Sequence, residues 1–297
     1  MAVPNAEPSY GYRKRNNVGH GDFVNGAIYG DYGTGKTYLG GTVDRVIQKC
    51  NNPKALEKLR APEGLKVRYA TLFANAEQGE DGLPPDCLEI IIKDITDYAS
   101  FGRLYDFLKL HIRYVQKKDY DSLVKLQKKY FAQTDENFEE LWIFKAVIID
   151  SLTEIQKYCL YQLIGLSADS KLDEEPEYMQ QRQWGTALEM ILLMVRNFRS
   201  LPIHTIFIIQ QMEDQDEKKK LFFRPALQGQ AKSSILGFFD FVGYYRMAVS
   251  QDAKRRRLYL TPIGAFKAKH RFPSFNGDYI DDPDFGDILA ARKGKGD

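Results

Sequence analysis

The sequence predicts an α/β fold with a mostly parallel central sheet, helices on both faces and an antiparallel extension near the C-terminus. Three observations support this prediction. Short, wholly apolar runs alternate with helix-compatible segments, which is typical of parallel strands buried on both faces. The apolar runs after residue 239 follow one another without long helices between them. The length of 297 residues is ample for one large core.

The first half of the chain is expected to supply strands at residues 23–29, 67–74 and 90–92. A helix-compatible segment covers residues 36–50. Apolar residues then recur at helical spacing across residues 98–144, which predicts a region of two or three amphipathic helices.

The second half is expected to continue this alternation within a single domain. We predict that residues 1–22 form an N-terminal arm, residues 23–271 the domain, and residues 272–297 a C-terminal tail. The expected strands cover residues 146–149, 203–209, 239–249, 257–260 and 266–269, and the expected helices cover residues 153–164 and 178–199.

The composition excludes several classes of protein. The 42 basic and 40 acidic residues give a formal charge of +2, which neither implies nor excludes a nucleic-acid partner. Cys50, Cys87 and Cys159 have no paired spacing, so neither a disulfide framework nor a zinc site is expected. No apolar run approaches the roughly 20 residues that span a bilayer. We therefore expect a cytoplasmic protein with no membrane partner.

The chain contains a full match to the phosphate-binding P-loop pattern, G-x-x-x-x-G-K-[ST]. In such a loop, backbone N–H groups surround the phosphates, Lys36 reaches the β- and γ-phosphates, and Thr37 binds Mg²⁺. An apolar run before the motif and a helix after it favour this interpretation over an ordinary glycine turn with an exposed lysine. The predicted nucleotide-binding residues are Gly30, Asp31, Tyr32, Gly33, Thr34, Gly35, Lys36, Thr37 and Tyr38.

Two acids are candidates for the chemistry at this loop. Asp150 follows the buried run 146–149 and is predicted to hold the Mg²⁺ of bound ATP, although an aspartate there is also a common helix N-cap. Glu77 follows another expected strand, where a carboxylate can activate the attacking water. Its alternative role is that of an ordinary loop acid beside Glu80 and Asp81.

Two glutamines close the apolar run 203–209. An amide at the end of a strand can hydrogen-bond the γ-phosphate or its attacking water and report hydrolysis to the loop that follows. Gln210 and Gln211 are both placed for this role, and a polar pair that simply ends a strand is the alternative.

The order of these motifs resembles that of the RecA-fold P-loop ATPases. Most of the chain, from residue 23 to 271, takes part in the resemblance, which is strongest to the phage-encoded RecA-like ATPases of the Sak type. The resemblance implies that Glu77 is the catalytic glutamate, Asp150 the Walker B aspartate and Gln211 the sensor. It also implies that Lys269 and Arg271 act on the active site of a neighbouring subunit in a head-to-tail homo-oligomer. A basic edge strand that resists aggregation is the alternative for these two residues.

A possible contact with single-stranded DNA follows the sensor glutamines. Basic residues beside aromatic ones suit single strands, because cations track phosphates and rings stack on bases. A solvated hairpin whose phenylalanines pack into the core is the alternative. The candidate DNA-binding residues are Lys218, Lys219, Lys220, Phe222 and Arg224.

Together these motifs predict a Mg²⁺-dependent ATPase that acts on single-stranded DNA in recombination or annealing. Two other functions fit the same motifs. One is an ATP-driven DNA motor or helicase loader, and the other is a nucleotide switch that binds protein partners without DNA.

Overall fold

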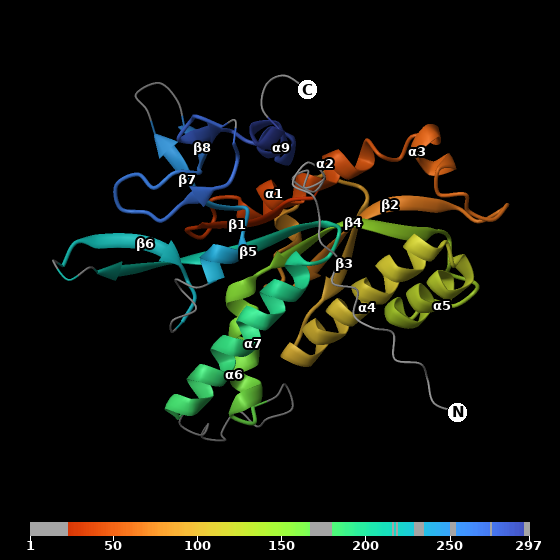
Figure 1. The fold of residues 1–297 in the computed structure, drawn as a ribbon, viewed down its shortest axis with the longest axis horizontal. Helices are drawn as coiled ribbons and strands as arrows, with labels where there is room; N and C mark the ends of the chain where they lie inside the picture. Colours follow the sequence, from red (N-terminus) through yellow and green to blue (C-terminus); the bar gives the residue numbers. More distant parts are fainter. Residues whose placement is uncertain are drawn as a thin grey trace, which may run out of the picture.

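A computed structural model describes residues 23–166, 180–215, 217, 219–228, 235–249, 254–273 and 275–293. Its strands are β1 (Asn25–Gly30), β2 (Val67–Asn75), β3 (Ile90–Asp94), β4 (Leu141–Asp150), β5 (His204–Gln215), β6 (Leu221–Pro225), β7 (Phe241–Val249), β8 (Lys254–Tyr259), β9 (Lys269–His270) and β10 (Tyr279–Asp281). Its α-helices are α1 (Lys36–Gly41), α2 (Val43–Gln48), α3 (Pro53–Glu57), α4 (Tyr98–Lys117), α5 (Tyr120–Phe131), α6 (Leu152–Leu163), α7 (Gln181–Arg199) and α9 (Phe285–Lys293). Figure 1 shows these elements arranged around one twisted sheet.

The main path of the sheet has the strand order β10-β8-β7-β1-β5-β4-β2-β3, with β6 beside β5 and β9 beside β7. The six strands from β7 to β3 are parallel, whereas β6, β8, β9 and β10 pair antiparallel with their neighbours. The predicted mostly parallel sheet with an antiparallel C-terminal extension is therefore confirmed.

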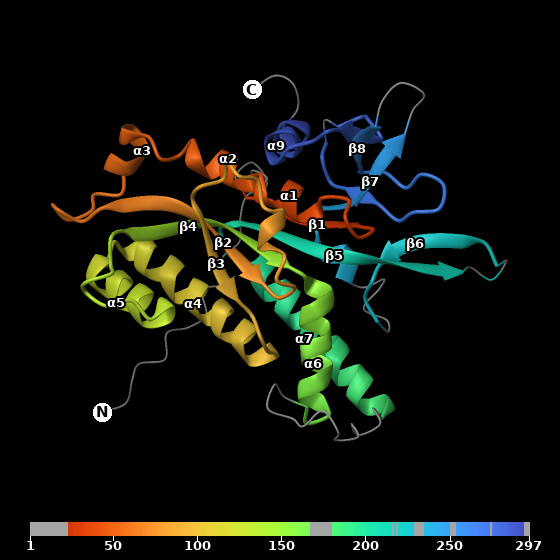
Figure 2. The same ribbon diagram turned by 180° about the vertical axis from the view of Figure 1, so that it is seen from behind.

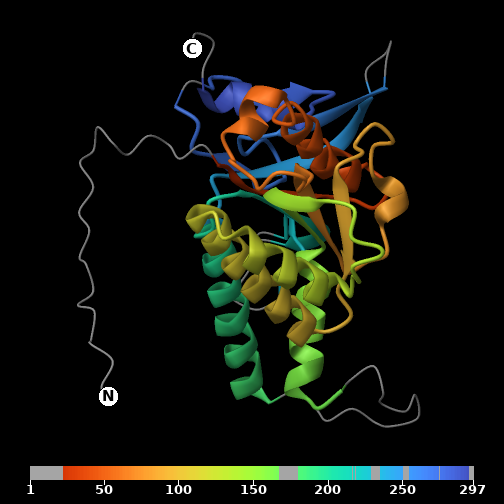
Figure 3. The ribbon, with the colours of Figure 1, turned by 90° about the vertical axis from the view of Figure 1, so that its right-hand side faces the viewer.

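Helices cover both faces of the sheet, as predicted. Helices α4, α6 and α7 pack on one face, over a core that includes Leu72, Val147 and Phe207. Helices α1, α2 and α9 pack on the other face, over a core that includes Ile28, Phe73 and Ile148. Figures 2 and 3 show this layering from behind and from the side. The neighbouring residues Phe73 and Leu72 serve opposite cores because side chains alternate along a strand.

The parallel strands begin at one edge of the sheet and end at the other. The carboxyl edge is where β1, β2 and β4 end, at Gly30, Asn75 and Asp150. Gly30 is aligned with Gln210 of β5, and Asn75 is aligned with Asp150. The amino edge is the opposite one, where the same strands begin. Residues that follow β1, β2 and β4 are thus brought together although they are far apart in the sequence.

The helical prediction for residues 98–144 is wrong at its C-terminal end. Helices α4 and α5 end by Phe131, and β4 already begins at Leu141. Leu141, Ile143 and Phe144 are buried, and Leu141 is aligned with Val67 of β2. Pairing with β2 along this whole length gives these residues a strand conformation.

The expected C-terminal tail is instead part of the folded domain. Strand β10 pairs with β8, and Phe285 and Ile288 of α9 are fully buried. The backbone N–H of Phe285 donates a hydrogen bond of 2.9 Å to the Thr42 hydroxyl between α1 and α2. The expected N-terminal arm, residues 1–22, lies outside the described residues.

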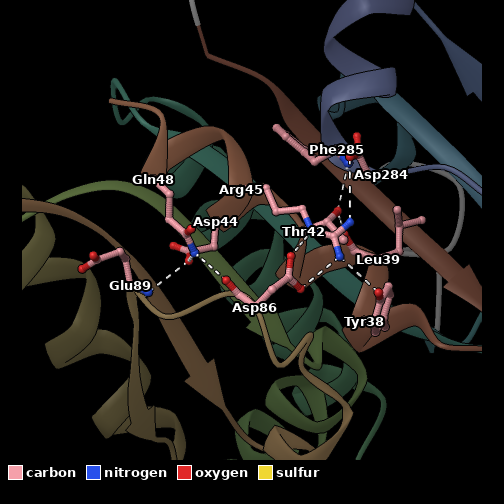
Figure 4. A network of polar contacts seen from close by, with 10 residues as sticks. All are labelled: Tyr38, Leu39, Thr42, Asp44, Arg45, Gln48, Asp86, Glu89, Asp284 and Phe285. Carbon is pink, nitrogen blue, oxygen red and sulfur yellow. Dashed lines mark hydrogen bonds and ion pairs between the residues drawn. The ribbon is translucent and has the colours of Figure 1, made fainter. Parts of the chain in front are cut away.

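A polar network ties the helices after the P-loop to their surroundings (Figure 4). The Arg45 guanidinium donates to both Asp86 carboxylate oxygens, at 2.8 and 3.0 Å, and to the Tyr38 hydroxyl at 3.1 Å. The buried Asp44 carboxylate accepts hydrogen bonds from the Thr71 hydroxyl of β2 and from Gln48. These contacts fix the helices that carry the P-loop against the sheet.

No helix among the described residues is long and apolar enough to cross a membrane.

Candidate active site

The P-loop follows β1 at the carboxyl edge of the sheet. A Cβ atom at Gly30 would lie 2.0 Å from the Tyr245 carbonyl oxygen, so the close approach of β1 to β7 requires glycine there. At the other end of the loop, Gly35 has a φ of 91°, in the left-handed region that favours glycine. Helix α1 then begins at Lys36. The loop therefore has the strand–loop–helix context that the motif requires.

Lys36 is buried inside this loop. Its ammonium group donates a hydrogen bond of 2.8 Å to the Asp31 carbonyl oxygen. Burial lowers the pKa of Lys36, and the charges of Asp150, Glu77 and Asp31 oppose this shift. The lysine thus supplies a positive charge near both the predicted metal ligand Asp150 and the predicted catalytic Glu77.

Thr37 and Asp150 form a pair of oxygen donors beside Lys36. The Thr37 hydroxyl donates a hydrogen bond of 2.6 Å to Oδ2 of Asp150. Asp150 is only 2% exposed, and burial raises its pKa to about 6, although the Thr37 hydrogen bond opposes this shift. The position of a Cβ atom on Gly79 is 3.5 Å from the same Asp150 oxygen, so the backbone also approaches closely here.

This pair fits Mg²⁺ bound together with a nucleotide. Magnesium prefers hard oxygen ligands and often combines one or two carboxylates with phosphate oxygens and water. Within the described part of the chain, no cluster of three or more histidine, cysteine or acidic side chains is placed to hold a metal. The donor set is therefore too small for an all-protein cage and suits an ion that arrives with a triphosphate.

Glu77 lies beside this pair, at the loop after β2. The Gln210 amide donates hydrogen bonds of 2.8 Å to both Glu77 carboxylate oxygens. The Ser151 hydroxyl also donates to Glu77. The oxygen of the same amide, Oε1 of Gln210, is buried and has no hydrogen-bond partner among the described residues. A carboxylate next to an unpaired amide acceptor is an arrangement that can hold and deprotonate a water molecule.

The structure brings Gln210, rather than Gln211, to Glu77. Successive side chains of a strand point to opposite faces, so only one of the two glutamines can face the acid. Gln210 is the last β5 residue aligned with β1, and its backbone N–H donates a hydrogen bond of 3.0 Å to the Thr153 hydroxyl. Gln211 is the first residue aligned with β6, opposite Pro225. The sequence assigned the sensor to Gln211, but the side chain that contacts Glu77 is that of Gln210, and β5 continues beyond both glutamines to Gln215.

Lys269 and Arg271 lie at the amino edge of the sheet, away from the P-loop of their own chain. In the sheet, Lys269 is aligned with Val242, and Val242 with Ala27 near the start of β1. The Arg271 guanidinium donates a hydrogen bond of 2.7 Å to the Gly237 carbonyl oxygen. Burial and the charge of Arg271 lower the pKa of Lys269 to about 8.

Of the candidate DNA-binding residues, Phe222 and Arg224 lie on β6 of the β5–β6 hairpin, the antiparallel pair formed by residues 211–215 and 221–225, and Lys219 and Lys220 lie directly before β6. This hairpin projects from the rest of the sheet (Figures 1 and 2). Lys219 and Lys220 are exposed, and the Phe222 ring lies 5.2 Å from the Lys267 ammonium group. Lys218 lies outside the described residues.

Arg224 does not fit the predicted DNA contact. It is only 8% exposed, its guanidinium donates a hydrogen bond of 2.7 Å to the Asp214 carboxylate, and a second one of 3.1 Å reaches the Leu227 carbonyl oxygen. These bonds hold the two hairpin strands together, so Arg224 is a structural residue.

Sequence reasoning gave no role to two residues that the structure places at the site. Ser151 follows Asp150 directly and contacts Glu77. The Arg256 guanidinium lies against Gly35 of the P-loop. The alternation of side chains in β8 was the available signal, because it separates Arg256 from its two arginine neighbours.

The fold and this site define a P-loop nucleotide-binding domain. A family model described as an AAA domain matches residues 22–272. The chain therefore belongs to this AAA domain family, in which nucleotide binding and hydrolysis are general properties. A search among curated proteins found no match.

Proposed function

We propose that the chain is a RecA-like ATPase of the Sak type, which acts on single-stranded DNA in recombination or annealing in the cytoplasm, that of the host cell if a phage encodes it. The observation that carries this proposal is the position of Gln210. This residue contacts Glu77 in the active site and also stands at the base of the projecting β5–β6 hairpin. Hydrolysis at the site and the position of the hairpin are thereby linked through one side chain.

Each residue of the site has a distinct part in ATP hydrolysis. Lys36 neutralises charge on the phosphates, and Thr37 with Asp150 would hold the Mg²⁺ that accompanies ATP. Glu77 accepts the proton of the attacking water. Gln210 orients that water through Oε1, which is buried and unpaired among the described residues.

The proposed assembly is a head-to-tail oligomer. Lys269 and Arg271 are separated from their own P-loop by the length of β1, since Ala27 and Gly30 alone are about 10 Å apart at the usual rise of a strand. This separation supports a role for them at a nucleotide bound to another subunit. A head-to-tail contact of this kind closes into a ring or continues as a filament.

The charges of the hairpin support DNA binding but also favour a second candidate function. Exposed Lys219 and Lys220 are suited to phosphates, but Glu213 and Glu217 are exposed on the same hairpin. Mixed charges of this kind suit a protein partner, so a nucleotide switch without DNA is the second candidate. An ATP-driven motor or helicase loader would need the same DNA contact and, in addition, directional movement.

The rate of ATP hydrolysis with and without single-stranded DNA tests the proposal. We expect DNA to raise the rate of the unmodified chain, and we expect Lys36→Ala to remove both the basal and the stimulated rate. Replacing Lys219 and Lys220 with alanine should remove the stimulation and leave the basal rate intact. A basal ATPase that single-stranded DNA neither stimulates nor binds would reject the DNA role and favour the switch.

A further inference from the structure

The three consecutive arginines of β8 face different surroundings. The Arg257 guanidinium donates a hydrogen bond of 2.5 Å to the Asp281 carboxylate and lies 4.3 Å from the centre of the Tyr279 ring. Arg255 is exposed to solvent. Arg256 lies between them in the sequence and therefore points to the opposite face of the strand, which is the face that carries the P-loop helix.

Arg256 is packed directly against the P-loop. The position of a Cβ atom on Gly35 is 3.1 Å from Cζ of Arg256 and 3.4 Å from its Nε. The same Cζ atom lies 5.6 Å from the centre of the Tyr38 ring. Asp282 fixes the backbone of Arg256 with two hydrogen bonds, one of 2.8 Å to its carboxylate and one of 2.6 Å from its N–H. Asp282 thus fixes the backbone of Arg256, and the side chain of Arg256 places its guanidinium against Gly35.

The Arg256 guanidinium hydrogen-bonds the Tyr245 hydroxyl and lies near the Tyr38 ring. No carboxylate of the described residues forms an ion pair with its guanidinium, in contrast to Arg257 with Asp281. Arg45, on the same Tyr38 ring at 5.8 Å, also has a carboxylate partner, Asp86. A half-buried guanidinium without an acid, placed against a phosphate-binding loop, is suited to a phosphate group.

We propose that Arg256 is a nucleotide-binding residue, whose guanidinium contacts phosphate oxygens of the nucleotide held by the P-loop of the same chain. The proposal rests on the nucleotide binding argued above. It differs from the role of Arg271, because Arg256 belongs to the same chain as the loop and needs no neighbouring subunit. A complete site then contains one arginine in cis and one in trans.

The test compares the binding of two probes, Mg-ATP and magnesium tripolyphosphate, by isothermal titration calorimetry. Tripolyphosphate has neither base nor ribose, so it isolates the contacts to phosphate. We expect Arg256→Ala to weaken binding of both probes by roughly ten- to a hundredfold, the usual loss for a hydrogen bond to a charged group. Arg255→Ala, the matched control on the exposed face of β8, should stay within about twofold of the unmodified chain.

Other outcomes distinguish failure of the Arg256–phosphate contact from failure of nucleotide binding itself. If Arg256→Ala weakens ATP binding but leaves tripolyphosphate binding unchanged, the guanidinium contacts the base or ribose and the proposal is overturned. Equal affinities in Arg256→Ala and Arg255→Ala overturn it as well. If the unmodified chain binds neither probe, the proposed function itself fails. Should Arg256→Ala not fold, Arg256→Gln keeps a polar, unbranched but shorter side chain without the charge, and its affinities decide in the same way.

Discussion

The two edges of the parallel sheet carry different chemistry. At the carboxyl edge, Lys36, Glu77 and Asp150 lie together, and their opposite charges compensate one another. At the amino edge, Lys269 and Arg271 have like charges, and burial together with the charge of Arg271 lowers the pKa of Lys269. One edge is therefore a site with its own counter-charges, whereas the other has positive charge left for an anion.

This difference is consistent with the proposed division of the chain between its own site and that of a neighbouring subunit. Parallel strands all end at one edge, so residues from β1, β2, β4 and β5 form one site within a single chain. The opposite edge cannot complete that site, because the sheet itself lies between them. Variants at the two edges test this division.

The largest effect is expected for Arg271→Ala. If Arg271 completes the site of a neighbour, the variant should bind ATP normally but lose about 10³- to 10⁵-fold in its hydrolysis rate, as other trans-acting arginines do. Steady-state hydrolysis and equilibrium ATP binding, measured on the same preparation, separate the two steps.

A mixing experiment provides the control for Arg271. Lys36→Ala subunits contribute an intact Arg271, so mixing them with Arg271→Ala subunits should restore part of the activity. Subunit exchange is shown separately with labelled chains. If exchange occurs and no mixing ratio restores hydrolysis, Arg271 does not act in trans and the division between the two edges fails.

A smaller loss, of roughly a hundredfold or more, is expected for Glu77→Gln. The amide keeps the shape of the side chain but cannot accept a proton, so ATP still binds while hydrolysis falls. Glu80→Gln is the matched control, since Glu80 accepts a hydrogen bond of 2.7 Å from the Asn75 side chain and has no assigned part in the reaction. Equal rates in both variants would return Glu77 to the role of a loop acid.

A change of about tenfold in the hydrolysis rate is expected at one of the two adjacent glutamines, Gln210 and Gln211. Gln210→Ala removes the amide that contacts Glu77, so we expect hydrolysis to fall about tenfold and DNA stimulation to disappear. Gln211→Ala, one residue further along β5, should retain the stimulation. Loss of stimulation in the Gln211 variant alone would restore the assignment that the sequence suggested.

The sequence was sufficient for the parts of the fold that depend on local pattern. The apolar runs before Gly30 and Asp150 are buried parallel strands, and the P-loop lies between a strand and a helix. The choice between Gln210 and Gln211 depends on which face of β5 meets Glu77, and this register is set by pairing with strands distant in the sequence.

Other features depended on tertiary packing that no local pattern records. Residues 272–297 were expected to be a tail outside the domain, but buried Phe285 and Ile288 pack within it. Arg224 is in a basic and aromatic segment, yet its partner Asp214 lies ten positions away across a hairpin. Arg256 reaches Gly35 only because β8 joins the sheet next to β7. In each case, the partner of the residue could not be identified before the strand order was known.

The last predicted effect concerns the stability of the fold at the carboxyl edge. Burial raises the pKa of Asp150 to about 6, above the value of about 4 in an unfolded chain. A raised pKa means that the folded state favours the protonated acid, so the buried charge costs stability above pH 6 and costs little below pH 4.

Asp150→Asn should therefore increase the free energy of unfolding at pH 7.5 by about 2 kcal/mol, while it impairs hydrolysis. At pH 5 the gain should fall to about half, because the native acid is then largely protonated when folded. Urea unfolding at the two pH values measures both quantities, and Asp31→Asn, at an exposed acid of the same loop, should change stability by less than about 0.5 kcal/mol. A variant less stable than the unmodified chain at pH 7.5 would show that the attraction between Asp150 and Lys36 outweighs the burial of the carboxylate.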